Sequence, residues 1–71
     1  MPADIRQRFG RRVRGLREAR EWTQVELAER LGIDRSYLAD VERGNRNISL
    51  MNIEVIAHGF KMSLAQFFEG I

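Results

Sequence analysis

Residues 23–44, TQVELAERLGIDRSYLADVERG, decide the fold of this chain. Thr23, followed three residues later by Glu26, forms a capping box, which marks the start of a helix. Leu27 and Leu31 then stand four residues apart, on one face of a helical period. The pattern therefore predicts a short amphipathic helix that begins directly after Thr23.

A glycine turn and a second helix follow. Gly32 stands where a helix end needs the left-handed backbone conformation, which glycine adopts because it has no Cβ to clash. Asp34 can cap the next helix, predicted over about residues 35–43, which turns Leu38 and Val41 inward. Two short helices joined by a tight glycine turn indicate a helix-turn-helix.

The spacing of the apolar and small residues is specific. Counted from Gln24, Ala28 is fifth, Gly32 is ninth, and Leu38 and Val41 are fifteenth and eighteenth. This pattern resembles the lambda-repressor/Cro (Xre-type) family of DNA-binding regulators. The run DRSYLADVERGNRNISL is also similar to the controller proteins of restriction–modification systems, although many small Xre-type regulators share such a run. An ordinary helical hairpin in a bundle is the alternative interpretation.

Capping residues predict three more helices, so we expect one all-α, compact five-helix domain over residues 1–71. The caps and ranges are Asp4 for residues 5 to about 20, Ser49 for about 50–59, and Ser63 with Gln66 for about 64–69. Apolar residues at helical spacing predict the inward face of the first helix: Ile5, Phe9, Val13 and Leu16. In the fourth helix the same spacing selects Leu50, Ile53, Ile56, Ala57 and Phe60. Gly10 and Gly15 should each weaken the first helix by about 1 kcal/mol relative to alanine.

Composition excludes several classes of protein. The 71 residues include no cysteine and one histidine, so neither a disulfide nor a zinc cluster is expected. No nucleophile–base set, phosphate-binding glycine loop or paired carboxylate suggests an enzyme, and no cofactor or small-molecule ligand is implied. No long apolar segment or signal peptide is present, which favours a cytoplasmic protein without a membrane partner.

The basic residues are almost all arginine. Net charge is only +2, but the pI is about 9.9 and eleven of the twelve basic residues are arginine, whose planar fork suits phosphate and guanine. A GC-rich coding bias explains this composition equally well. Seven arginines crowd the first helix, where we expect a mostly solvated face with some phosphate contacts: Arg6, Arg8, Arg11, Arg12, Arg14, Arg17 and Arg20.

The helix over residues 35–43 should lie in the major groove, because helix-turn-helix proteins contact bases from the start of this helix. Its outward residues, and thus the candidates for base contacts, are Arg35, Ser36, Ala39 and Asp40. Arg35 is the best candidate for a bidentate contact to guanine, worth roughly 1–3 kcal/mol of discrimination. Asp40 can accept from the cytosine amino group or orient Arg35, and its charge would exclude a phosphate contact.

The resemblance to the Xre-type family implies further roles. Gln24 would clamp the DNA backbone at a helix start, and the candidates for other backbone contacts are Thr23, Tyr37, Arg43, Asn45, Arg46 and Asn47. A half-buried Tyr37 that packs near the turn is an equal alternative. The family also pairs an arginine at the position of Arg17 with a glutamate at the position of Glu42, which would align the first helix with the recognition helix.

The C-terminal helices contain more apolar residues than one short helix can bury. Related small regulators pair through these helices, so our candidates for a dimer interface are Met51, Val55, Leu64, Phe68 and Ile71. The alternative is that Phe67 and Leu64 simply close the core of the monomer. We expect one phenylalanine, of Phe67 and Phe68, to serve each purpose.

The leading functional hypothesis is a homodimeric regulator of transcription that binds a roughly palindromic operator in double-stranded DNA. A restriction–modification controller, an antitoxin and a phage-type repressor would use the same residues. A surface that contacts RNA polymerase would make the protein an activator, but no stretch of the sequence indicates one. From a different class, a protein-interaction adaptor could keep the fold without the DNA contacts.

Overall fold

The computed structural model describes residues 3–71; Met1 and Pro2 lie outside the described residues. The predicted fold class is confirmed: these residues form a compact array of helices without strands. The helices are α1 (Ile5–Ala19), α2 (Gln24–Leu31), α3 (Arg35–Glu42), α4 (Leu50–Gly59) and α5 (Leu64–Glu69). None of the helices within residues 3–71 is long and apolar enough to cross a membrane.

Local capping chemistry sets the helix starts. The boxes predicted at Thr23 with Glu26 and at Ser63 with Gln66 are both formed. Glu26 accepts the backbone N–H of Thr23 at 2.8 Å, and this bond holds the pKa of its carboxyl below the ordinary value of 4.5. Gly32 ends α2 with φ of +69°, the left-handed conformation that the sequence predicted.

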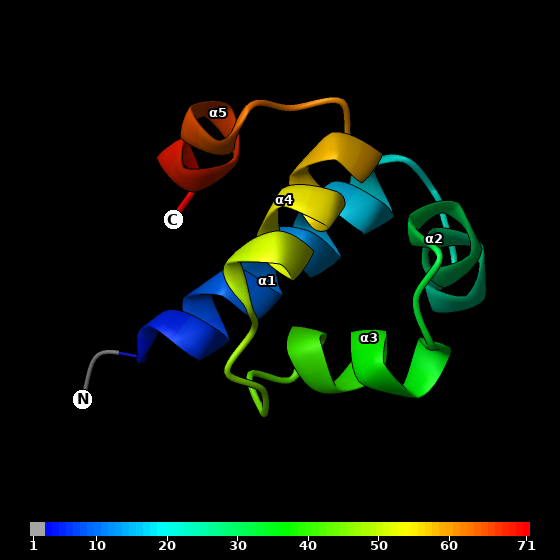
Figure 1. Ribbon diagram of the computed structural model, residues 1–71, viewed down its shortest axis with the longest axis horizontal. Helices are drawn as coiled ribbons and strands as arrows, with labels where there is room; N and C mark the ends of the chain where they lie inside the picture. The colour runs from blue at the N-terminus through cyan, green and yellow to red at the C-terminus, as the bar shows by residue number, and fades with distance from the viewer. Residues whose placement is uncertain (1–2) are drawn as a thin grey trace.

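The helices pack around one small core (Figure 1). α1 packs against α3, α3 against α2, α2 against α4, and α4 against α5. Figure 1 shows α4 in front of α1, with α2 and α3 together at one side and α5 at the opposite corner. The fully buried side chains come from all five helices, and the largest are Phe67, Leu27, Leu38, Ile56 and Val13.

Gly10 explains how α1 approaches the end of α3. A Cβ built on Gly10 would lie 2.4 Å from the carbonyl oxygen of Val41 and 2.6 Å from that of Glu42. The absence of a side chain therefore lets the two backbones meet. The helical cost of this glycine is offset by a close approach that alanine would prevent.

Two residues predicted to face the core face solvent instead. Ile5 is 50% exposed and Leu50 is 84% exposed. Each is the first residue of its helix, and the first turns of α1 and α4 extend beyond the core that the other apolar residues fill. Periodicity identified the correct face but not where the core ends.

Gly10 and Gly15 provide a matched pair for testing this packing. Gly10→Ala should lower the free energy of unfolding by about 1–3 kcal/mol, because the new methyl group overpacks the contact with α3. Gly15→Ala should raise it by about 0.5–1 kcal/mol, because no atom lies within 4 Å of the added Cβ. Urea unfolding of both variants measures the difference. Equal effects of the two substitutions would contradict the close approach of α1 and α3.

Candidate nucleic-acid interface

The carboxylate of Glu42 joins three helices. Arg17 of α1 donates from Nε to Glu42 Oε2 at 2.8 Å and from Nη2 to Oε1 at 3.0 Å, so the pair is bidentate. Gln24, the first residue of α2, donates from Nε2 to the same Oε1 at 3.0 Å. The structure therefore brings together the two residues of the expected ion pair and adds Gln24 to them.

This network is shielded from water. The side chains of Arg17 and Glu42 are only 12% and 3% exposed. The hydrogen bond to Glu42 raises the pKa of the Arg17 guanidinium above its ordinary value, so this guanidinium stays charged. Arg17 also donates from Nη1 to the backbone carbonyl of Trp22 at 2.8 Å. The start of α2 and the end of α3 are thus fixed to the same point on α1.

The outward face of α3 begins with two exposed residues, Arg35 and Ser36. Asp34 caps the helix by accepting the backbone N–H groups of Ser36 and Tyr37 at 2.7 and 3.3 Å. Ala39 and Asp40 are half-buried, while Leu38 and Val41 point into the core. The base-contact candidates therefore lie along one edge of α3, with the most exposed at its N-terminal turn.

Asp40 does not orient Arg35, which corrects one of the two roles predicted for it. Its Oδ1 binds Arg43 Nη2, and its Oδ2 lies 3.5 Å from Arg46 Nη2. Asp40 stands five positions after Arg35, which places their side chains about 140° apart around the helix. Arg43 stands three positions after Asp40, on the same side of the helix. The loop after α3 turns Arg46 back towards the same carboxylate.

Tyr37 combines packing with a polar contact. Its ring is half-buried against the core, which agrees with the packing alternative given for it in the sequence. Its hydroxyl accepts a hydrogen bond from Asn52 of α4 at 3.1 Å, and the Arg46 guanidinium lies 5.1 Å from its ring centroid. Nothing in the sequence indicated Asn52, because a single asparagine in a helix gives no pattern.

The remaining backbone-contact candidates flank α2 and α3. Thr23 is exposed, and its hydroxyl oxygen accepts the N–H of Glu26, which leaves the hydroxyl proton free for another acceptor. Gly44 follows α3 with φ of +79° and opens the loop that contains the exposed residues Asn45, Arg46 and Asn47. The candidates from α2, α3 and this loop are therefore held on elements that the Glu42 network joins.

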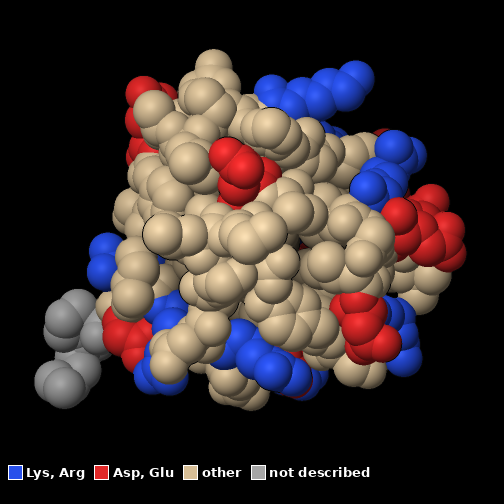
Figure 2. Space-filling view, viewed as in Figure 1, with Lys and Arg blue, Asp and Glu red and all other residues tan. Residues whose placement is uncertain are grey.

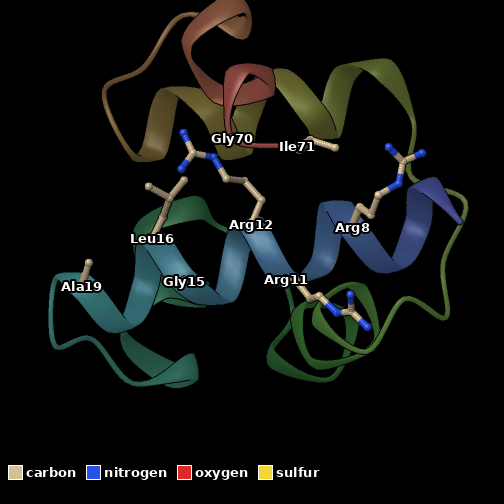
Figure 3. A pocket seen from close by; sticks show the side chains of 8 residues that line it. All are labelled: Arg8, Arg11, Arg12, Gly15, Leu16, Ala19, Gly70 and Ile71. Atoms are coloured by element: carbon tan, nitrogen blue, oxygen red, sulfur yellow. The ribbon is translucent and has the colours of Figure 1, made fainter. Parts of the chain in front are cut away.

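The seven arginines between residues 6 and 20 mostly form a solvated face, as expected, since five of them are exposed and only Arg12 and Arg17 are half-buried. Five of the seven make hydrogen bonds within residues 3–71: Arg6, Arg12, Arg14, Arg17 and Arg20. Arg12 donates to the carbonyls of Phe67 and Gln66 at 2.9 and 3.2 Å and so ties α5 to α1. Figure 3 shows Arg12 with Arg8 and Arg11 around a hollow beside Gly15 and Leu16.

An apolar patch covers part of α4 and α5. We define this patch as the exposed residues Leu50, Met51, Val55, Leu64 and Phe68, which are 84%, 79%, 38%, 42% and 39% exposed. Figure 2 shows uncharged atoms over much of this side of the molecule, with most charged side chains near its margins. Phe67 is fully buried in the core, whereas the place of Phe68 in a dimer interface stays a prediction. Ile71 is half-buried and lines the hollow of Figure 3 instead of the patch.

Known proteins are similar to this chain in sequence and in fold. The sequence profile of the family described as Helix-turn-helix matches residues 13–67. Control protein C.MunI of a Mycoplasma species is 38% identical, over 96% of this chain and 93% of its own. The structure of the restriction–modification controller protein C.AhdI from Aeromonas hydrophila is 43% identical over 89% of this chain and 96% of its own, with a TM-score of 0.83.

A third relative is the controller protein C.Esp1396I, solved as a tetramer in complex with its natural 35 base-pair operator. It is 28% identical over 96% of this chain and 90% of its own, with a TM-score of 0.86. These matches confirm the resemblance to Xre-type regulators and to controller proteins that the sequence pattern indicated.

The Arg17–Glu42 pair predicts a large loss of stability from one substitution. Arg17→Ala should lower the free energy of unfolding by about 3–5 kcal/mol, because it leaves the Glu42 carboxylate buried without its cation. Arg14→Ala is the matched control, since Arg14 pairs with Glu18 on the same helix but both side chains are more than half exposed. Arg14→Ala should lower the free energy of unfolding by less than about 1 kcal/mol. Urea unfolding curves that show equal losses would contradict an alignment role for Arg17.

Proposed function

The chain belongs to the helix-turn-helix family of DNA-binding transcription regulators, and we propose that it acts as a homodimer on a roughly palindromic operator. In this proposal residues 1–71 form a single DNA-binding domain. α3 enters the major groove, and the start of α2 contacts the flanking backbone. The protein acts in the cytoplasm, where its DNA partner lies, and has no catalytic role.

The observation that carries this proposal is the hydrogen bond that attaches α2 to Glu42 of α3. Gln24 at the start of α2 and Glu42 at the end of α3 are joined at 3.0 Å, so the clamp and the recognition helix keep a fixed distance. The Gln24 amide has a second N–H that remains available for a phosphate oxygen. A helix N-terminus also favours an anion through its free backbone N–H groups.

Each candidate residue then has a place in the complex. We assign base contacts to the outward edge of α3: Arg35, Ser36, Ala39 and Asp40. We assign backbone contacts to the residues around it: Thr23, Gln24, Tyr37, Arg43, Asn45, Arg46 and Asn47. Arg35 contributes most to discrimination, because it is exposed and its fork matches the two acceptors of guanine.

The apolar patch supports the dimer. Leu50 and Met51 stand almost fully exposed beside Leu64 and Phe68, around a shallow hollow that a second copy can fill. A twofold axis through the patch would present two copies of α3 to half-sites about 34 Å apart. We therefore assign the interface to Met51, Val55, Leu64 and Phe68, with Leu50 added because of its exposure. Ile71 is the weakest of the predicted interface residues, since it lines a different hollow.

Within the regulators, we favour a controller protein of a restriction–modification system. C.AhdI carries that description and C.MunI is described as a control protein, and this chain matches each over more than nine-tenths of the relative's length. An antitoxin or a phage-type repressor remains the second candidate, because an immunity repressor of a Bacillus phage is 48% identical over 48 residues. Neighbouring restriction and methyltransferase genes would support the first, and a toxin gene the second.

Removal of Arg35 tests the function. Native protein should bind its own upstream DNA much more tightly than a scrambled duplex, and Arg35→Ala should remove roughly 1–3 kcal/mol of that preference. Arg14→Ala removes the same charge from the outer side of α1 and should leave the preference unchanged. Fluorescence anisotropy with both duplexes measures this preference for each protein. Equal weak binding of native protein to the two duplexes would contradict the regulator and favour the adaptor.

Substitution of Met51 tests the dimer. Met51→Glu should raise the dimer dissociation constant by at least about 100-fold, because a twofold axis buries the new charge once on each side. Val25→Glu is the control, since Val25 is an exposed apolar residue of α2 outside the patch. Sedimentation velocity across a concentration series measures both. A dimer that survives Met51→Glu but dissociates in Val25→Glu would move the interface to α2.

A further inference from the structure

We propose that Asp40 is a specificity-determining positioning residue: its carboxylate holds Arg43 and Arg46 in the free protein and so limits binding to DNA that is not the operator. This inference rests on the proposed function, because it concerns the same face of α3. It assigns to Asp40 a role towards two neighbouring side chains as well as towards a base.

The two oxygens of one carboxylate each bind a different arginine. Oδ1 accepts from Arg43 Nη2, and Oδ2 lies 3.5 Å from Arg46 Nη2. The Asp40 side chain is 29% exposed, whereas those of Arg43 and Arg46 are 62% and 49% exposed. The carboxylate is thus the more sheltered partner, and the two arginines are the ones that solvent or a phosphate can reach.

Further contacts hold Arg46 beside this carboxylate. Its guanidinium lies 5.1 Å from the centroid of the Tyr37 ring, within the range of a cation–π contact. The Tyr37 hydroxyl is in turn bound by Asn52 of α4, so the ring itself is fixed. The backbone carbonyl of Asp40 also accepts the N–H of Asn45 at 2.9 Å. Asp40 therefore organises the loop after α3 through its backbone and its side chain together.

A phosphate must compete with Asp40 for these two arginines. Binding to arbitrary DNA depends almost entirely on phosphate neutralisation, and each neutralised phosphate adds about −0.9 to the slope of log affinity against log salt. While Asp40 holds both guanidiniums, it cancels one of their two positive charges and repels an approaching phosphate. Phosphates of non-operator DNA can bind the two arginines only after the ion pairs with Asp40 break. Such DNA offers the Asp40 carboxylate no new hydrogen-bond donor in their place.

The operator can offer the Asp40 carboxylate a new hydrogen-bond donor in place of the two arginines. A cytosine amino group in the major groove donates a hydrogen bond to a carboxylate, so Asp40 released from the arginines would find a new partner there. Arg43 and Arg46 then turn to phosphates without leaving an unpaired anion against the DNA. The same carboxylate would thereby weaken binding to every sequence except one that offers this donor.

Asp40→Asn tests the inference, with Glu29→Gln as the matched control. Both remove one negative charge, but Glu29 is an exposed residue of α2 that makes no ion pair within residues 3–71. Each variant is titrated with the upstream duplex and a scrambled duplex between about 50 and 200 mM salt. Asp40→Asn should bind the scrambled duplex roughly 3–10-fold more tightly than native protein, with a salt slope steeper by about 1. Its preference for the upstream duplex should fall, and Asp40→Glu should restore it.

Two results separate failure of this inference from failure of the proposed function. If native protein prefers the upstream duplex and Asp40→Asn keeps the preference and slope of Glu29→Gln, net charge alone explains the effect and the inference is overturned. If native protein binds both duplexes alike, the proposed function fails and the specificity role of Asp40 fails with it. A steeper slope and lower preference in Asp40→Asn only would support the role.

Discussion

The contact between the Glu42 carboxylate and Arg17 is the constraint on which the rest of this structure depends. Glu42 lies at the end of α3, Arg17 lies on α1, and Gln24 of α2 shares one of the carboxylate oxygens. A chain of 71 residues buries few large side chains, so its apolar core alone leaves the helices several ways to shift. A buried bidentate pair adds little net stability, but it penalises every arrangement that separates its partners. We infer that its role is to fix the orientation of α3.

Much of this architecture could be predicted because it depends on local chemistry. Helix starts follow from side chains that bind the free N–H groups of the first turn, and Thr23 and Ser63 each carry that information within four residues. Gly32 marks the turn for an equally local reason. The left-handed conformations of Glu21 and Lys61, both with φ of 57°, were not predictable, because these residue types give no such signal.

What the sequence could not supply depends on tertiary packing. Periodicity placed Leu50 on the inward face of its helix, but only the packed structure shows that α4 starts beyond the core. Gly10 looked like a weakness in a helix and is instead the point where two backbones meet. At the candidate interface, the residue types that bind DNA were visible in the sequence, whereas the partners of Asp40 depend on how the loop after α3 folds back.

Chemical-shift mapping by NMR tests the central claim most directly: the start of α2, the exposed edge of α3 and the following loop form one DNA-binding face. Labelled protein would be titrated with its upstream duplex, and the backbone amide shifts followed residue by residue. The account predicts the largest changes at residues 23–24, 35–40 and 43–47, with little change over Arg8 and Arg11 on the outer side of α1. Large changes around those two arginines, with α3 unaffected, would contradict it.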